Sequence, residues 1–254
     1  MKERIIGADE VGKVEAFKQM MSVAVYKNPE VETDFKTGDS KKNSKSGSWK
    51  TGKAITGFSS FDEVESRAYV NENYGIVYAV RIISNEEYNS WKEKSKDINA
   101  NVILSYAHND AIRMVYDKVK ELGWKVDKIV IDDFISTNVE HEKQFGEYIK
   151  RIDKNMKTVN ELSDVEMIMT PKAEDKYPDT VGTASIIGDY IDQLWQVKVK
   201  EKFGDVNIDF LPAWFGNGNE ISDLLQLIIE KCGSLDESPV VMKHTSYYEK
   251  IKKI

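Results

Sequence analysis

The sequence places carboxylates directly after two short apolar segments. Asp9 and Glu10 follow one of these segments, and Asp132 and Asp133 follow the other. Carboxylate oxygens suit hard divalent cations such as Mg²⁺ or Mn²⁺, and paired ions of this kind can activate water and stabilise the leaving oxygen when a phosphodiester is hydrolysed. The alternative is that these residues are unrelated surface acids, which is common in a chain of which 31% is charged.

A third acidic point lies at residues 172–178, where Glu174 and Asp175 stand in a polar loop. The residues after this loop have helical spacing, with Ile187, Ile191 and Leu194 on the face expected to be buried. Because the chain has only three histidines and one cysteine, a zinc site is not expected. Spacing alone does not decide whether the three acidic points share one site.

Strands must position these acids. Residues 5–8 and 129–131 are continuous apolar runs with β-branched side chains, which is typical of strands buried on both faces of a parallel or mixed sheet. We expect further strands at 20–26, 69–70 and 75–83, and a helix at 101–122 that stops at Gly123. In open sheets flanked by helices, ligands gather beyond the strand ends, so two central strands ending in acid can deliver their carboxylates to one place.

Asp9 and Glu10 are consecutive strand residues, so their side chains are expected to point to opposite faces of the sheet. They can share a ligand only if the chain leaves regular strand geometry near Gly12, where a glycine permits a sharp turn. The alternative is a strand end whose two acids face water.

Composition limits the partners of these acids. The single cysteine, Cys232, excludes an internal disulfide and fits a reducing compartment. The charged start is not a signal peptide, and no run of about 18 apolar residues occurs, so we expect a cytoplasmic protein without membrane contact. The net charge of -7 argues against non-specific binding to a polyanion, but a carboxylate cluster for cations contributes to that sum.

A basic stretch at residues 36–53 combines six lysines with Ser, Gly, Thr and Asn, and Trp49 is almost its only apolar residue. We expect a mobile loop here. It is either a solvated surface excursion or a set of phosphate contacts, in which Lys41 and Lys42 would take part.

The motifs together carry a family resemblance. Six blocks stand in the order expected of type 2 ribonucleases H: Ile6-Gly7-Ala8-Asp9-Glu10-Val11-Gly12, Thr37-Gly38-Asp39-Ser40-Lys41-Lys42, Glu87-Tyr88-Asn89, His108-Asn109-Asp110-Ala111-Ile112, Ile131-Asp132-Asp133-Phe134, and Lys172-Ala173-Glu174 with Thr183-Ala184-Ser185-Ile186-Ile187. The chain most resembles ribonuclease HIII, because of its His-Asn-x-Ala and Lys-Ala-Glu blocks and a closing Lys243-His244 segment.

The resemblance implies an α/β, ribonuclease H-like fold, with a mixed central sheet flanked by helices and a helical C-terminal extension. It implies an endonuclease that uses Mg²⁺ or Mn²⁺ to hydrolyse the RNA strand of RNA/DNA hybrids, leaving 5′-phosphate and 3′-hydroxyl ends. We expect the protein to act as a monomer. We expect one catalytic domain over 1–254, with a helical and basic tail at about 220–254.

Carried over position by position, the resemblance assigns catalysis and metal binding to four carboxylates and substrate binding to seven further residues. The carboxylates are Asp9, Glu10, Asp132 and Glu174, and the substrate-binding residues are Gly12, Lys13, Lys41, Lys42, His108, Asn109 and Ser185. Counting back from the Ala-Ser-Ile block selects Asp175 in place of Glu174, but the residues flanking Glu174 keep their places, so Glu174 is preferred.

The chain departs from the family pattern at two points. Val14 follows Lys13 where the family usually has a second glycine, and a side chain there would hinder close backbone approach to the sugar 2′-hydroxyl. The chain also begins directly with the catalytic strand, without the platform that usually precedes it in ribonucleases HIII; the basic stretch and the tail lysines could replace that platform in part. A non-catalytic nucleic-acid-binding protein and a nuclease specific for ribonucleotides embedded in duplex DNA remain alternatives.

Overall fold

The fold is taken from a computed structural model, which describes residues 3–13, 18–32, 45–135, 140–163, 165–203 and 230. Val14, Lys41, Lys42 and the predicted tail at 220–254 lie outside the described residues, apart from residue 230 within the tail.

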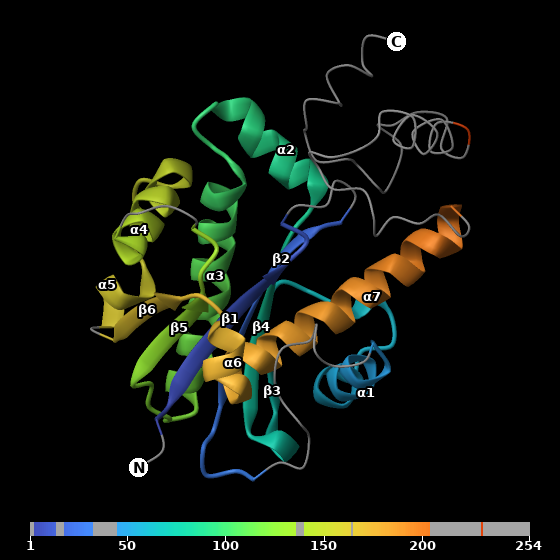
Figure 1. The fold of residues 1–254 in the computed structure, drawn as a ribbon, viewed down its shortest axis with the longest axis vertical. Coiled ribbons are helices and arrows are strands. Elements are labelled where there is room, and N and C mark those ends of the chain that lie inside the picture. Colours follow the sequence, from blue (N-terminus) through green and yellow to red (C-terminus); the bar gives the residue numbers. More distant parts are fainter. Residues whose placement is uncertain are drawn as a thin grey trace.

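A six-stranded mixed sheet forms the centre of the described chain, in the order β3-β4-β2-β1-β5-β6 (Figure 1). The strands are β1 (Ile5–Val11), β2 (Met20–Lys27), β3 (Ala68–Asn71), β4 (Ile76–Ile83), β5 (Lys128–Asp132) and β6 (Glu166–Thr170). β5 runs parallel to both β1 and β6, whereas β2 is antiparallel to β1 and β4, and β3 is antiparallel to β4. The predicted mixed sheet is confirmed, and the two strands that end in acid are neighbours.

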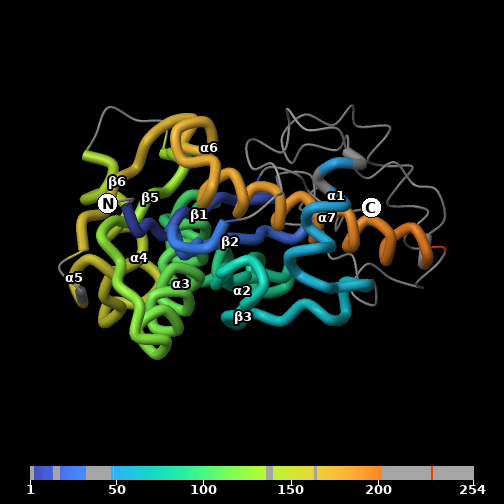
Figure 2. The backbone as a smooth tube through the Cα atoms, turned by 90° about the horizontal axis from the view of Figure 1, so that it is seen from below, coloured from blue at the N-terminus to red at the C-terminus, as the bar shows by residue number. Residues whose placement is uncertain are grey.

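Helices cover both faces of the sheet, as the end-on view shows (Figure 2). One face carries α2 (Asn85–Lys94), α3 (Ala100–Glu121), α4 (His141–Ile152) and α5 (Val159–Ser163). The other carries α1 (Lys45–Thr56), α6 (Ala173–Lys176) and α7 (Thr183–Phe203), with a π-helical turn, Pro178–Gly182, between the last two. Short 3₁₀ turns at Phe61–Glu63 and Glu72–Tyr74 flank β3.

The central strands are apolar because both of their faces are buried. Ile6 and Ala8 of β1 pack into the core under α3, whereas Val11 contacts the core under α7. This alternation fixes the face of every later residue of the strand. The helix predicted at 101–122 is also confirmed, since α3 ends at Glu121 and Gly123 has the left-handed φ of +74°.

The prediction of a loop through residues 36–53 is wrong from Lys45 onward, because α1 begins there. Serine, threonine and glycine give this segment a low helix propensity, and the helix is stabilised by packing on α7. The ring of Trp49 lies edge-on to Tyr190 at 4.8 Å between centroids, and a Cβ at Gly52 would lie 2.4 Å from the Cβ of Tyr190. Trp49 and Gly52 therefore bring α1 close to α7, while Lys50 and Lys53 stay exposed.

Candidate active site

The first two carboxylates point to opposite faces of the sheet, as their spacing predicts. β1 remains a strand through Val11; Asp9 pairs in register with Val23, and Glu10 pairs with Ser22. Paired residues of antiparallel strands share a face. Asp9 therefore lies on the face covered by α7, and Glu10 lies on the face covered by α3.

The turn predicted at Gly12 is present. Gly12 has φ +74°, and a Cβ there would lie 2.0 Å from the carbonyl oxygen of Gln19. The chain thus leaves strand geometry after both acids, so a ligand shared by Asp9 and Glu10 has to lie beyond the strand end. Lys13 then donates from Nζ to the carbonyl oxygen of Phe134 at 2.9 Å, and its burial lowers the pKa of the ammonium.

Asp132 ends β5 next to the acidic end of β1. The parallel register pairs Ala8 with Ile131, so Asp9 and Asp132 are the next residues on two adjacent strands. The backbone N–H of Ala173, at the start of α6, donates to Oδ1 of Asp132 at 2.9 Å. This hydrogen bond places the segment that holds Glu174 directly beside Asp132, so the second and third acidic points of the sequence are neighbours.

The surroundings of Asp132 make the ionised form of its carboxyl group unfavourable. The pKa of Asp132 is raised to about 6, chiefly by burial and also by the negative charges of Glu174 and Glu10, against the opposing hydrogen bond from the Ala173 N–H. A carboxyl group with acidic neighbours on two sides gains stability when a cation is bound among them.

The pKa of Asp9 is raised as well. Burial is the largest cause, followed by the negative charge of Glu10 and, more weakly, that of Asp132. Hydrogen bonds from the Glu10 N–H, at 2.9 Å, and from the Ser185 side chain favour the ionised form and oppose the rise. Ser185, predicted to bind substrate, is thus buried at the beginning of α7 and bonded to Asp9.

Glu174 faces this cluster and Asp175 does not. The side chain of Glu174 acts directly on the pKa of Asp132, and its Oε2 is buried without a hydrogen-bond partner among the described residues. Asp175 is exposed. Lys172, which precedes α6, holds the left-handed φ of +55° that is costly for a side-chain-bearing residue. The assignment of Glu174 as the fourth carboxylate stays a prediction, and it agrees with the proximity of Glu174 to Asp132.

His108 and Asn109 are buried in α3, with 0% and 1% of their surface exposed. The Nδ2 of Asn109 donates to the carbonyl oxygen of Lys157 at 3.2 Å, and Nδ1 of His108 lies 2.7 Å from Oγ of Ser22. Direct contact with a substrate would require these buried side chains to become accessible. The sequence did not point to Ser22, because its role depends on the register of β2 beside Glu10.

Divalent cations suit this donor set. Glu10 and Glu174 each present a buried Oε2 without a hydrogen-bond partner among the described residues. Burial, together with repulsion between the carboxylates, raises the pKa of Asp9 and Asp132. Within the described ranges, no three His, Cys, Asp or Glu side chains are already arranged around one point suitable for a metal ion. Binding would therefore require side-chain rotation to draw the acids together.

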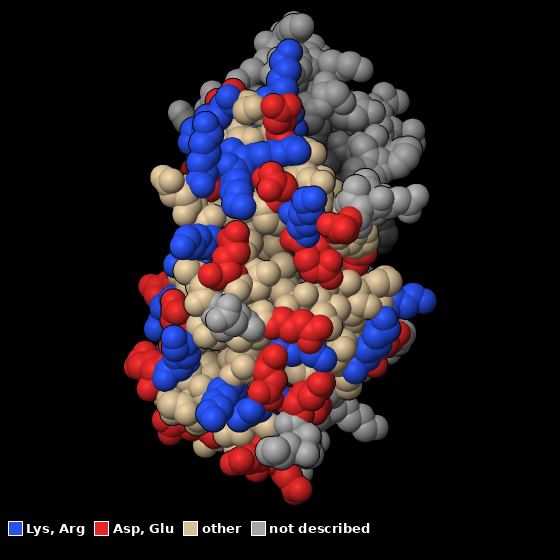
Figure 3. Space-filling view, turned by 90° about the vertical axis from the view of Figure 1, so that its left-hand side faces the viewer, with Lys and Arg blue, Asp and Glu red and all other residues tan. Residues whose placement is uncertain are grey.

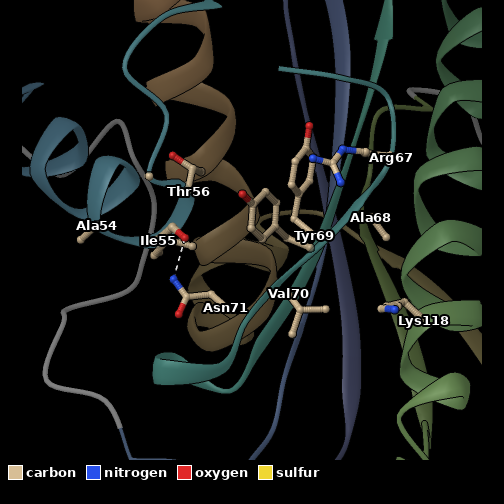
Figure 4. Close-up of a pocket in the computed structure, with 11 residues that line it drawn as sticks. Ala54, Ile55, Thr56, Arg67, Ala68, Tyr69, Val70, Asn71 and Lys118 are labelled. Atoms are coloured by element: carbon tan, nitrogen blue, oxygen red, sulfur yellow. Dashed lines mark hydrogen bonds between the residues drawn. The ribbon is translucent and has the colours of Figure 1, made fainter. Parts of the chain in front are cut away.

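A pocket of about 440 Å³ lies elsewhere, at the β3 edge of the sheet (Figure 4). It is lined by residues from α1, β3 and α3, among them Thr56, Tyr69 and Lys118, and the side chain of Asn71 donates to the carbonyl oxygen of Ile55 at 2.7 Å. None of the four carboxylates lines it. The acidic site is thus distinct from this pocket.

Comparisons with known proteins show the family and the fold of the chain. A family model described as Ribonuclease HII matches residues 6–210. Among solved structures, the Q54A mutant of Bst RNase HIII is similar with a TM-score of 0.64 at 20% identity, and the match covers 99% of this chain and 70% of that one. Bst RNase HIII in complex with Mn²⁺ gives 0.60 at 18% identity, covering 99% and 70%.

The ribonuclease H2 from Pyrococcus horikoshii OT3 is similar with a TM-score of 0.62 at 18% identity, and the match covers 98% of this chain and 97% of that one. At these identities the likeness establishes the fold. No protein of curated function matches the sequence. Among the described residues, no helix has both the length and the apolar character to cross a bilayer.

Proposed function

Because the chain belongs to the ribonuclease HII family and is thereby a nuclease of the ribonuclease H type, we propose that it hydrolyses the RNA strand of RNA/DNA hybrids with two divalent cations. The products are a 5′-phosphate and a 3′-hydroxyl. We further propose that it acts as a monomer in the cytoplasm, where a single cysteine fits a reducing environment.

The observation that carries this proposal is the convergence of carboxylates at the ends of β1 and β5. Asp9, Glu10, Asp132 and Glu174 would hold Mg²⁺ or Mn²⁺, and such ions, when bound, activate water and stabilise the departing 3′-oxygen. The protein's own part is to keep these acids ionised around the reacting phosphate. The raised pKa of Asp132 indicates that this ionisation is costly without a cation.

Gly12 and Lys13 are proposed to contact substrate beside the carboxylates. Gly12, with φ +74°, forms the turn after β1 that leads to Lys13, and the Lys13 ammonium lies near Glu10 and Asp133. In this role, the Lys13 ammonium gives up its hydrogen bond to the Phe134 carbonyl oxygen and donates to a phosphate oxygen of the substrate instead. Burial, which lowers the pKa of Lys13, strengthens its interaction with an anion that displaces water.

Further from the centre, basic side chains would add backbone contacts. Lys50 and Lys53 are exposed on α1, and Lys and Arg side chains gather toward the end of the molecule where α2 lies (Figure 3). Lys92 and Lys94 occupy the last turn of α2. Lys41 and Lys42 remain proposed contacts outside the described residues. Such contacts favour a nucleic acid despite the net charge of -7.

The experiment is cleavage of a labelled RNA/DNA hybrid by the purified protein with Mg²⁺, Mn²⁺ or chelator. Single-stranded RNA, an all-DNA duplex and a DNA duplex with one ribonucleotide are tested in parallel. The proposal expects metal-dependent cutting of the RNA in the hybrid, with products that a 5′-phosphate-dependent exonuclease degrades. Binding of the hybrid without cutting under either metal would refute it, and cutting confined to the single-ribonucleotide duplex would reassign the substrate.

A further inference from the structure

A buried histidine lies beside one of the four carboxylates. His108 of α3 has 0% of its side chain exposed; its Nδ1 is 2.7 Å from Oγ of Ser22, and its Nε2 is 3.6 Å from Oε2 of Glu10. Neither Nε2 of His108 nor Oε2 of Glu10 has a hydrogen-bond partner among the described residues. A nitrogen that can donate a hydrogen bond and an oxygen that can accept one are thus both buried and face each other at a distance slightly longer than a hydrogen bond.

Three elements hold this arrangement. The β1–β2 register places Ser22 directly beside Glu10 on the α3 face, and α3 brings the imidazole of His108 against both. On the far side, the ring of Phe134 stacks on the imidazole with 5.1 Å between centroids and 24° between planes. The ring is therefore restrained in position and in plane.

The two neighbours of the imidazole together select one tautomer. When Glu10 is ionised, its oxygens only accept hydrogen bonds, so a favourable contact requires the proton on Nε2. Nδ1 is then an acceptor, and the Ser22 hydroxyl donates to it at 2.7 Å. In the opposite tautomer, the lone pair of Nε2 would face the carboxylate of Glu10. A closure of about 0.6 Å brings Nε2 and Oε2 to ordinary hydrogen-bond distance.

We propose that Ser22 and His108 form a positioning pair, which fixes the Nε2–H tautomer and orients the carboxylate of Glu10 for cation binding. The inference rests on the proposed function, because it assigns Glu10 to the metal site. Ser22 and His108 act through Glu10 and do not touch the substrate. Partners that orient a metal-binding side chain typically contribute 10- to 100-fold in metal affinity.

Packing alone does not explain the pair. An apolar ring would stack equally well on Phe134, and burial of two imidazole nitrogens is unfavourable unless they are hydrogen-bonded. The Ser22 hydroxyl satisfies one nitrogen, and Glu10 is the polar group next to the other.

The test compares Ser22→Ala with Ser105→Ala. Ser105 is an equally buried serine of α3, but its hydroxyl bonds only to the Asn101 carbonyl oxygen of its own helix, so it controls for loss of a buried hydroxyl. Isothermal titration with Mn²⁺ alone measures affinity without any turnover. The Kd of Ser22→Ala is expected to rise about 10-fold or more, whereas Ser105→Ala should match the wild type. Hybrid cleavage by Ser22→Ala should recover as Mn²⁺ is raised.

A second measurement uses the intact wild-type protein. ¹⁵N NMR of the imidazoles reports the tautomer, and His108→Phe, which keeps a ring on Phe134, identifies the signal by its loss among three histidines. We expect the proton on Nε2. A proton on Nδ1 with the Nε2 lone pair facing Glu10 would overturn the inference, as would an unchanged Mn²⁺ affinity in Ser22→Ala. Failure of the wild type to bind Mn²⁺ and to cleave would instead refute the proposed function, and this inference with it.

Discussion

Replacement of Asp132 with Asn is expected to stabilise the metal-free protein while it abolishes metal-dependent cleavage. The substitution keeps the shape of the side chain and an oxygen that accepts the Ala173 N–H, which lies 2.9 Å from Oδ1. It removes a negative charge that burial and two neighbouring carboxylates make unfavourable. Stability and function therefore change in opposite directions at this position.

The size of the gain follows from the pKa of Asp132. A rise from 3.8 to about 6 corresponds to about 3 kcal/mol of destabilisation of the ionised form. Because Asp132 is partly exposed, solvent screening reduces this to about 1–2 kcal/mol. Between about pH 4 and 6 the folded protein holds a proton that the unfolded chain releases, so its free energy of unfolding falls as pH rises through that window. Asn has no charge to lose, so the advantage of the variant is full above pH 6 and absent below about pH 4.

Urea unfolding of chelator-treated protein at pH 4 and at pH 7.5 measures this directly. The matched control is Asp127→Asn, because Asp127 pairs with Arg4 at 2.5 Å and its pKa is lowered, so loss of its charge should not stabilise the protein. An Asp132→Asn variant that is no more stable than wild type at pH 7.5, or that gains equally at both pH values, would refute the reasoning.

Three further predictions test the site and the fold around it. Glu174→Gln should reduce hybrid cleavage at least 100-fold while Asp175→Asn changes it less than a few-fold, and the reverse order would reassign the fourth carboxylate. Gly7→Ala should lower the free energy of unfolding by about 1–3 kcal/mol, because its Cβ would lie 2.4 Å from a backbone nitrogen of the π-helical turn; an unchanged urea midpoint would contradict this. The double variant Lys50→Ala, Lys53→Ala should bind the hybrid more weakly, and the slope of its log binding constant against log salt should fall by the equivalent of about two phosphate contacts. An unchanged slope would mean that α1 does not contact the nucleic acid.

Much of the sheet could be predicted from the sequence because its central strands are buried on both faces. The runs that end at Asp9 and Asp132 are β-branched and apolar, so both strands and the acids after them were located. The period of two also predicted that Asp9 and Glu10 diverge. β6 was missed, since Glu166–Thr170 is only five residues long and partly exposed at the edge of the sheet.

The rest depended on contacts between distant residues. α1 lacks a helical composition and becomes ordered against Tyr190 of α7. The contact of Ser22 with His108 spans 86 residues and needs both the β1–β2 register and the placement of α3. Local sequence patterns indicate the periodicity of an element and the positions of turns. They do not indicate which face of a helix packs against which pair of strands.

The central claim, that these carboxylates hold the catalytic cations, is tested most directly by anomalous diffraction from crystals soaked with Mn²⁺. We expect two Mn²⁺ peaks at the ends of β1 and β5, each with carboxylate oxygens of Asp9, Glu10, Asp132 or Glu174 at about 2.1 Å. Peaks elsewhere, or none at these four residues under saturating Mn²⁺, would contradict it.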